Sequence, residues 1–153
     1  MTESIPAAGR EAIVLLVEDN EDHAFLTRES FNEAKLKVDL HHVDNGEKCM
    51  AFLRRLPPYE NAPRPDILLL DIHMPRMDGY EVMEAIAKDE SLKMMPVIVL
   101  TTSADIIDVN RMYGLRCNSF IKKPVDFDGF TKAMREIAGY WFNLVVLPEP
   151  PNR

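Results

Sequence analysis

The chain of 153 residues has few cysteines, no long apolar run and no excess of positive charge. Cys49 and Cys117 stand far apart without a CxxC pair, so the sequence predicts neither a disulfide framework nor a zinc site. No stretch of the sequence approaches the ~20 apolar residues of a membrane span. Residues 1–10 lack the charged start and apolar run of a signal peptide. We therefore expect a cytoplasmic protein.

The charge balance is acidic, with 18 Lys and Arg against 25 Asp and Glu and a net charge of −7. Nucleic acids and anionic lipid surfaces bind basic faces, so we expect neither as a partner. A hydrophobic content of 46% supports a real core, and the length fits one domain, since most domains have about 100–150 residues. We expect that domain at residues 11–139, after a loose lead-in at 1–10 and before an extension at 140–153.

Short apolar runs, which favour strands, alternate with helical patterns along the chain. The runs lie at residues 12–17, 38–43, 67–70, 96–100 and 119–122. Helices are predicted from 20 or 22 to about 34, at 47–56, from 78 to about 88, and from 103 to about 114. The last helix follows the apolar stripe Phe127, Phe130, Met134, Ile137, Trp141 and Leu144, whose first four members we expect in the core. This order predicts an α/β fold of the flavodoxin-like, doubly wound type: a five-stranded parallel sheet, order 2-1-3-4-5, with helices on both faces.

Reactive side chains follow four of the predicted strands. Glu18 and Asp19 follow the first strand, Asp71 the third, Thr101 the fourth and Lys123 the fifth. The carboxyl ends of parallel strands meet at one edge of a doubly wound sheet, so these groups should converge there. Three close carboxylates repel one another, and a hard divalent cation such as Mg²⁺ relieves that repulsion. A carboxylate beside such a metal can attack phosphorus, with a lysine and a hydroxyl binding the transferred group.

The same residues carry a resemblance to the receiver domains of two-component response regulators, over about residues 12–138. It rests on the Glu18-Asp19 pair, LLLDIHMPRMDG around Asp71, VIVLTTSA around Thr101, and FIKKP around Lys123. The resemblance implies a signalling domain, not an enzyme, that takes a phosphoryl group from a histidine kinase. It assigns the following roles: phosphoacceptor Asp71; Mg²⁺ ligands Glu18, Asp19, Asp71 and the backbone carbonyl of His73; phosphoryl contacts Thr101 and Lys123.

The resemblance also implies a conformational switch. Thr101 would move towards the phosphoryl group, and Phe120 would then turn inward and reshape the neighbouring surface. Phe120 stands where the family often has tyrosine, and it lacks the hydroxyl that would hold the inward state. The side chains of His73 and Ser103 would flank the path of the attacking water, and we expect them to tune phosphate lifetime. The Lys123–Pro124 bond is expected to be cis by the same analogy.

The C-terminal segment has more apolar side chains than one helical face can bury. Such patches usually mark interfaces, so we expect a homodimer contact formed by Tyr140, Trp141, Phe142, Leu144 and Val145. The alternative is that Trp141 and Leu144 merely close the core. VEDNEDHAFL, LTTSA, SFIKKPVDF and YWFNL resemble the stand-alone regulators of bacterial phytochrome kinases, which are commonly dimers. We therefore expect a bacteriophytochrome kinase as partner, and an output by protein contact because no output domain follows Leu147.

Three other interpretations are weaker. A phosphatase of the haloacid dehalogenase type needs a second aspartate where this chain has His73, and a substrate-capping insertion is missing. A flavodoxin-like cofactor binder needs a Gly-rich or hydroxyl-rich phosphate loop where Glu18-Asp19 would repel the anion. A pseudo-receiver that is never phosphorylated remains an alternative, although the full set of five site residues argues against it.

Overall fold

The computed structural model describes residues 11–35, 37–103 and 105–149, so the predicted lead-in at 1–10 and residues 150–153 lie outside the described residues. The strands of the described chain are β1 (Ala12–Val17), β2 (Val38–Val43), β3 (Ile67–Leu70), β4 (Val97–Thr101) and β5 (Ser119–Lys122). They pair in parallel in the order β2-β1-β3-β4-β5. The predicted flavodoxin-like doubly wound sheet and its strand order are confirmed.

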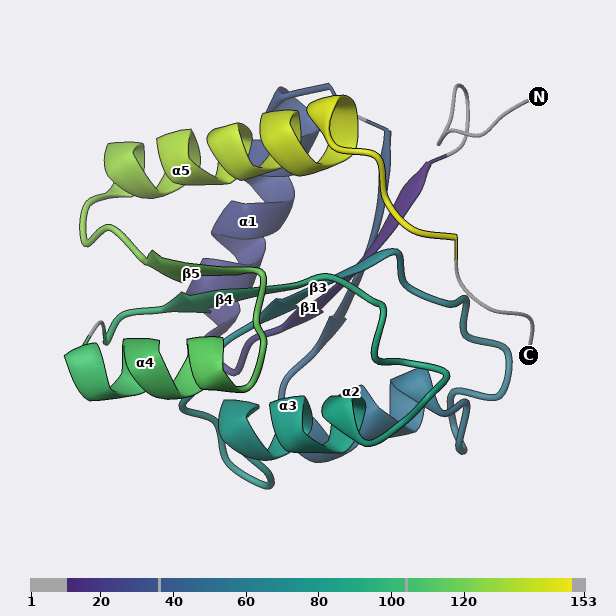
Figure 1. The fold of residues 1–153 in the computed structure, drawn as a ribbon. Helices are drawn as coiled ribbons and strands as arrows, with labels where there is room; N and C mark the ends of the chain where they lie inside the picture. Colours follow the sequence, from purple (N-terminus) through teal and green to yellow (C-terminus); the bar gives the residue numbers. More distant parts are fainter. Residues whose placement is uncertain (1–10, 36, 104, 150–153) are drawn as a thin grey trace.

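Helices cover both faces of the sheet (Figure 1). One face carries α1 (Glu21–Glu33) and α5 (Phe127–Gly139), and the other carries α2 (Gly46–Leu53), α3 (Gly79–Ala87) and α4 (Ile106–Gly114). Among the described helices, none is long and apolar enough to cross a membrane. Because the strands are parallel, they all end at one edge of the sheet. The connections β1–α1, β3–α3, β4–α4 and β5–α5 meet at this carboxyl edge, at the left of Figure 1.

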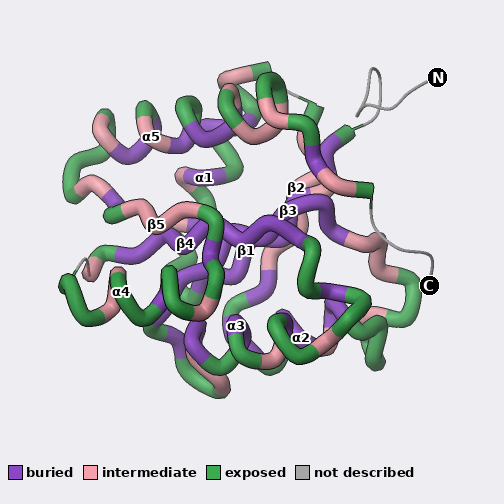
Figure 2. The backbone as a smooth tube through the Cα atoms, in the orientation of Figure 1, coloured by how far each residue is buried: buried purple, intermediate pink, exposed green. Residues whose placement is uncertain are grey.

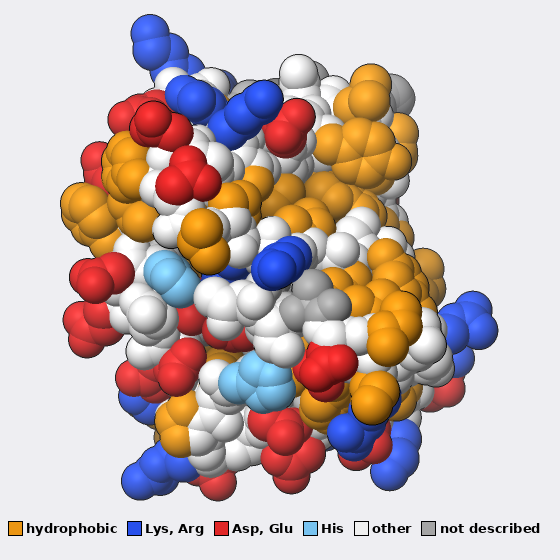
Figure 3. All heavy atoms as spheres, turned by 90° about the vertical axis from the view of Figure 1, so that its left-hand side faces the viewer, with side chains coloured by type: hydrophobic (Ala, Val, Ile, Leu, Met, Phe, Trp, Pro, Cys, Tyr) orange, Lys and Arg blue, Asp and Glu red, His pale blue; other side chains and the backbone are white. Residues whose placement is uncertain are grey.

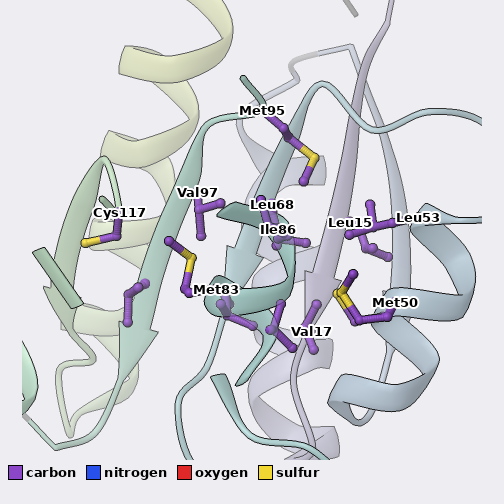
Figure 4. Close-up of a cluster of buried hydrophobic side chains, with 14 of the residues drawn as sticks. Leu15, Val17, Met50, Leu53, Leu68, Met83, Ile86, Met95, Val97 and Cys117 are labelled. Carbon is purple, nitrogen blue, oxygen red and sulfur yellow. The ribbon is translucent and has the colours of Figure 1, made fainter. Parts of the chain in front are cut away.

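Two hydrophobic clusters, one on each face, hold the helices to the sheet. Along β1 the side chains alternate: Val14 and Leu16 join the cluster under α1 and α5, and Leu15 and Val17 join the other. The second cluster, drawn in Figure 4, is rich in methionine and includes Met83. The buried tube segments of Figure 2 concentrate in the central strands. This two-sided burial explains why the central strands are continuous apolar runs.

Helix starts follow from capping side chains, and two predicted boundaries change. Asn20, Asn45 and Asp78 each accept a backbone N–H of the turn they precede. The helix predicted from residue 103 starts instead at Ile106, because the Ser103 hydroxyl donates to Asp108 and does not cap. The helix predicted at 47–56 ends at Leu53.

Two further expectations about the C-terminal third are wrong. Phe127 is not in the core but 61% exposed, because it is the first residue of α5 and lies at the carboxyl edge. The Lys123–Pro124 bond is not cis, since the cis bond among the described residues is Pro57–Pro58. Trans is the lower-energy form of an X–Pro bond.

The segment after α5 folds back on the domain. A π-helical turn, η1 (Tyr140–Leu144), follows α5. Trp141 and Phe142 pack against the cluster under α1 and α5, and the Phe142 ring meets that of Phe31 edge-on at 5.7 Å. Tyr140 and Leu144 stay 53% and 73% exposed. The apolar stripe of α5 therefore leaves the core at Leu144, because the wider turn rotates that residue outward.

Candidate functional site

Three carboxylates gather at the carboxyl edge of the sheet. Glu18 and Asp19 directly follow β1, and Asp71 directly follows β3, the strand that pairs with β1. One carboxylate oxygen from each lies within 4.8 Å of those of the other two. Glu18 and Asp71 are buried, whereas Asp19 is exposed at the edge of the group. The predicted convergence of the three acids is therefore present in the structure.

A buried lysine lies among these acids. Lys123, which directly follows β5, is only 2% exposed. Its Nζ forms an ion pair with Glu18 and lies 3.3 Å from Asp71 Oδ2. The backbone N–H of Lys123 donates to the Thr101 carbonyl at 2.7 Å, which continues the β4–β5 pairing past the last strand residue. Main-chain pairing thus fixes where the ammonium enters the acidic group.

Burial changes the ionisation of this group. Loss of solvent raises the pKa of Glu18 to about 7, although the Lys123 ammonium opposes that rise. Burial and the nearby Lys123 charge both lower the pKa of His23. The neutral ring of His23 places Nδ1 3.0 Å from Lys123 Nζ, so it accepts a hydrogen bond from the ammonium. The edge of the sheet therefore holds a protonatable carboxylate beside a fully paired lysine.

The connection between β3 and α3 fixes the Asp71 carboxylate. Asp71 Oδ1 accepts the N–H of Ile72 at 2.7 Å, and the N–H of Gly79 donates to the Ile72 carbonyl at 2.8 Å. A Cβ atom at Gly79 would lie 2.6 Å from the Asp71 carbonyl oxygen, which is too close for any side chain. The glycine of MPRMDG is therefore needed for α3 to begin directly against the backbone of Asp71.

The outer part of the same connection is held by the start of α2. Arg76 and Met77 have left-handed backbones, with φ of 52° and 81°. Their carbonyls accept the N–H groups of Glu47 and Gly46, each at 3.1 Å. These bonds compensate for a conformation that non-glycine residues rarely adopt. The loop that borders the acids is therefore fixed at both ends.

An open hollow borders Asp19, the exposed member of the acidic group. Its volume is about 530 Å³, and it is lined by Asp19, Asp44, Asn45, Lys48, Pro75 and Arg76. Figure 3 looks onto this edge of the molecule, where acidic and histidine side chains lie among exposed hydrophobic ones. An ion, a water molecule or a phosphorylated side chain can reach Asp19 by this route.

The remaining predicted residues lie around the acids. Thr101 is fully buried at the end of β4, and its Oγ1 accepts the Ser103 N–H at 3.4 Å. The side chains of His73 and Ser103 both approach Asp108: His73 Nε2 at 3.9 Å and the Ser103 hydroxyl at 3.2 Å. Phe120 is half-buried against the cluster of Figure 4. The geometry brings these residues together, and their roles stay predictions.

Sequence reasoning missed His23 and Asp108. His23, His41 and His42 are all half-buried. His42 Nε2 lies 2.7 Å from the Glu18 carbonyl oxygen. The sequence does contain a signal for His23, which lies one helical turn after the capping residue Asn20. In the structure its ring lies 5.5 Å from that of Phe130 in α5. Asp108 gave no such signal, since its partners come from three separate segments.

The chain is similar to known regulators in sequence. The family model of the response regulator receiver domain matches residues 14–135. The response regulator Rcp1 of Synechocystis sp. is 36% identical over 136 residues, which is 89% of this chain and 92% of Rcp1. The probable methanogenesis regulatory protein FilR2 of Methanothrix harundinacea is 35% identical over 140 residues, which is 90% of this chain and 88% of FilR2.

Solved structures agree with that similarity. The phosphorylated cyanobacterial phytochrome response regulator RcpA superposes with a TM-score of 0.87 at 34% identity, covering 91% of this chain and 99% of RcpA. The Mn²⁺-bound form of Rcp1 superposes with a TM-score of 0.87 at 36% identity, covering 90% and 99% of the two chains. The hard oxygen donors of Glu18, Asp19 and Asp71 fit a divalent cation.

Cation binding at these acids should weaken as the pH falls through about 7, because the buried Glu18 must lose its proton to become a ligand. Below that pKa we expect Mn²⁺ affinity to fall about tenfold per pH unit, the slope for release of one proton. Calorimetric titration across this range measures the slope. Glu18→Gln is the control: binding becomes weaker but loses this pH dependence. Equal slopes in the two proteins would show that Glu18 is not the titrating ligand.

Proposed function

This chain belongs to the response-regulator receiver family, and we propose that it is a single-domain response regulator that takes a phosphoryl group on Asp71. The observation that carries the proposal is the position of Asp71, held between two further carboxylates and a buried lysine at the open edge of the sheet. Receiver domains are signalling domains that work with a histidine kinase. We further propose that the receiver unit spans 11–139, and that the protein acts in the cytoplasm, where the kinase meets its ATP.

The attacking group in this proposal is the Asp71 carboxylate. Its Oδ1 is occupied by the Ile72 N–H, whereas Oδ2 faces the Lys123 ammonium. During transfer, the P–N bond of a phosphohistidine breaks while a P–O bond to Asp71 forms, and the imidazole leaves. Lys123 then neutralises negative charge on the transferred group, and the Thr101 hydroxyl donates to one of its oxygens.

Mg²⁺ is the proposed cofactor. Glu18, Asp19, Asp71 and the backbone carbonyl of His73 would hold it, since carboxylate and carbonyl oxygens are its preferred ligands. When bound, the cation supplies positive charge that offsets the clustered acids and the phosphoryl oxygens. Burial of Glu18, which raises its pKa, supports this assignment, because a buried carboxylate gains most from a nearby positive charge.

Residues at this edge would change conformation on phosphorylation and would also control hydrolysis of the acyl phosphate. Thr101 would move towards the phosphoryl group, and Phe120, on the strand beside it, would turn inward. The side chains of His73 and Ser103 would flank the water that later hydrolyses the acyl phosphate. The chain would therefore catalyse its own phosphoryl transfer and its own dephosphorylation, without acting on a separate substrate.

Phosphorylation is tested directly by intact mass after incubation with Mg²⁺ and a small-molecule phosphodonor. We expect the native chain to gain one phosphoryl group only when the metal is present, and Asp71→Asn to gain none. Asp89→Asn is the matched control, because Asp89 lies between α3 and β4, away from the acids, and should leave the gain unchanged. No gain in the native chain would favour the pseudo-receiver alternative.

A bacteriophytochrome is the proposed kinase. RcpA is a phytochrome response regulator and resembles this chain in fold and sequence. The side chains beside the acids suit a protein partner: Phe25 of α1, Val125 of the β5–α5 connection and Phe127 at the start of α5 are 61%, 98% and 61% exposed. Exposed apolar side chains next to a reactive group provide contact area for the kinase domain that delivers phosphohistidine.

The kinase contact can be separated from the chemistry with one surface variant. Val125→Glu should slow transfer from a phosphorylated bacteriophytochrome about tenfold or more, since the charge opposes an apolar contact. Phosphorylation by the small-molecule donor should stay at the native rate. Leu56→Glu, a similar change at an exposed residue between α2 and β3, should alter neither rate. Native transfer rates in Val125→Glu would exclude this docking surface.

We also propose a homodimer contact at the C-terminal extension, residues 140–153. Tyr140, Leu144 and Val146 are exposed apolar side chains of this segment, and Val145 is half-buried. Trp141 and Phe142 of the same segment pack against the domain core and so attach the segment to it. Exposed apolar residues on a rigid base are typical of self-association surfaces.

Sedimentation velocity tests this contact. The native chain should sediment as a dimer and Leu144→Glu as a monomer, because a buried unpaired charge is costly at an apolar interface. Leu56→Glu should remain dimeric. A dimer in Leu144→Glu, or a monomer in the native chain, would contradict the proposal.

A further inference from the structure

Asp108 of α4 joins three segments that lie apart in the sequence. Its carboxylate accepts hydrogen bonds from the Tyr80 hydroxyl of α3 and, at 3.2 Å, from the Ser103 hydroxyl before α4. His73 Nε2 of the β3–α3 connection lies 3.9 Å from Oδ2. These contacts, with the Tyr80 bond foremost, lower the pKa of Asp108. The carboxylate is therefore an ionised acceptor of two hydroxyl hydrogen bonds, with the His73 ring close to it.

The rest of α4 is weakly attached to the domain. Met112 is the buried side chain of this helix, while Ile106 and Ile107 are 66% and 73% exposed. In the described part of the chain, Asp105 precedes α4 without a side-chain hydrogen bond to its first turn. The first half of the helix consequently depends on the side chain of Asp108 for its position.

Arg111 strengthens the same attachment one turn later. Its guanidinium lies 3.8 Å from the centre of the Tyr80 ring, a cation–π contact between α4 and α3. Tyr80 is thereby held through its hydroxyl by Asp108 and through its ring by Arg111. The two contacts fix the rotation of α4 about its own axis relative to α3. They thereby fix the position of the Asp108 carboxylate oxygens.

We propose that Asp108 is a positioning residue, which holds the side chains of His73 and Ser103 beside Asp71 and ties α4 to the state of the acids. The proposal rests on Asp71 being the phosphoacceptor. With both side chains held, they cover the approach of water to the phosphorylated carboxylate. Without Asp108 they turn freely, water enters more easily, and the phosphoryl group is lost sooner.

The same contacts give α4 a direct connection to the reaction. Thr101 Oγ1 accepts the N–H of Ser103, and the Ser103 hydroxyl donates to Asp108. Movement of Thr101 towards a phosphoryl group therefore displaces Ser103 and, through the retained hydrogen bond, Asp108. The first turn of α4 then shifts in the phosphorylated state.

Two measurements on the full chain test the inference. The first loads Asp71 with a small-molecule phosphodonor and Mg²⁺, removes the donor, and follows loss of the phosphoryl group by intact mass. Asp108→Ala should lose it about tenfold faster than the native chain, the factor typical of one lost charge-assisted hydrogen bond. Asp105→Asn, at the acidic residue just before the same helix, should decay at the native rate.

The second measurement is amide hydrogen exchange of residues 106–110 in the unphosphorylated protein, which is independent of the phosphoacceptor assignment. Asp108→Ala should exchange about tenfold faster there. Tyr80→Phe, which removes only the hydroxyl, should show part of that increase, and so should Asp108→Asn, because its amide oxygen replaces only one of the two accepting oxygens. Native exchange in Asp108→Ala would overturn the inference, as would an equal effect of Asp105→Asn on either measurement. A chain that cannot be phosphorylated but shows the exchange change would contradict only the proposed function.

Discussion

The arrangement of the site depends on one buried ammonium. Lys123 and Glu18 are 2% and 3% exposed, and moving a single charge out of water is costly unless an opposite charge meets it. Lys123 meets Glu18, Asp71 and the neutral ring of His23 at once. One lysine nevertheless leaves a group of three acids with an excess of negative charge. This excess explains why the site suits a divalent cation, and why its state changes when the charge on Asp71 changes.

The parallel sheet makes this charge arrangement possible. Because β1, β3 and β5 all end at the same edge, residues more than 100 positions apart, such as Glu18 and Lys123, become neighbours. Close packing around the edge then removes alternatives. Gly79 lets α3 begin against the Asp71 backbone, and the N-terminal amides of α2 hold the left-handed residues of the same loop. The chemistry is thus supported by main-chain bonds and does not depend on mobile side chains alone.

How far the sequence predicts this protein varies with the range of the interactions involved. Strands such as Ile67–Leu70 were predicted at their observed bounds, because burial on both faces requires a continuous apolar run. The five principal site residues were predicted because strand ends in this topology share one edge. Ser103 was misassigned as a helix start, since the choice between capping and binding Asp108 depends on a residue that only the fold brings near. Phe127 matched the apolar period of α5, but periodicity does not reveal where the sheet ends and leaves a helix start uncovered.

The position of α4 connects the site to the surface by two routes. At its beginning, Asp108 binds Ser103, which in turn contacts Thr101. Near its end, the Tyr113 hydroxyl accepts the backbone N–H of Phe120 at 3.2 Å. Phe120 has no hydroxyl of its own, so in this chain the polar link between β5 and α4 comes from the helix and not from the switch residue. Both routes end on the same helix, which has one buried side chain and is the least anchored of the five α-helices of the described chain. A weakly packed helix held by a few polar contacts shifts at a small free-energy cost, and this property suits an element that must report a single phosphoryl group.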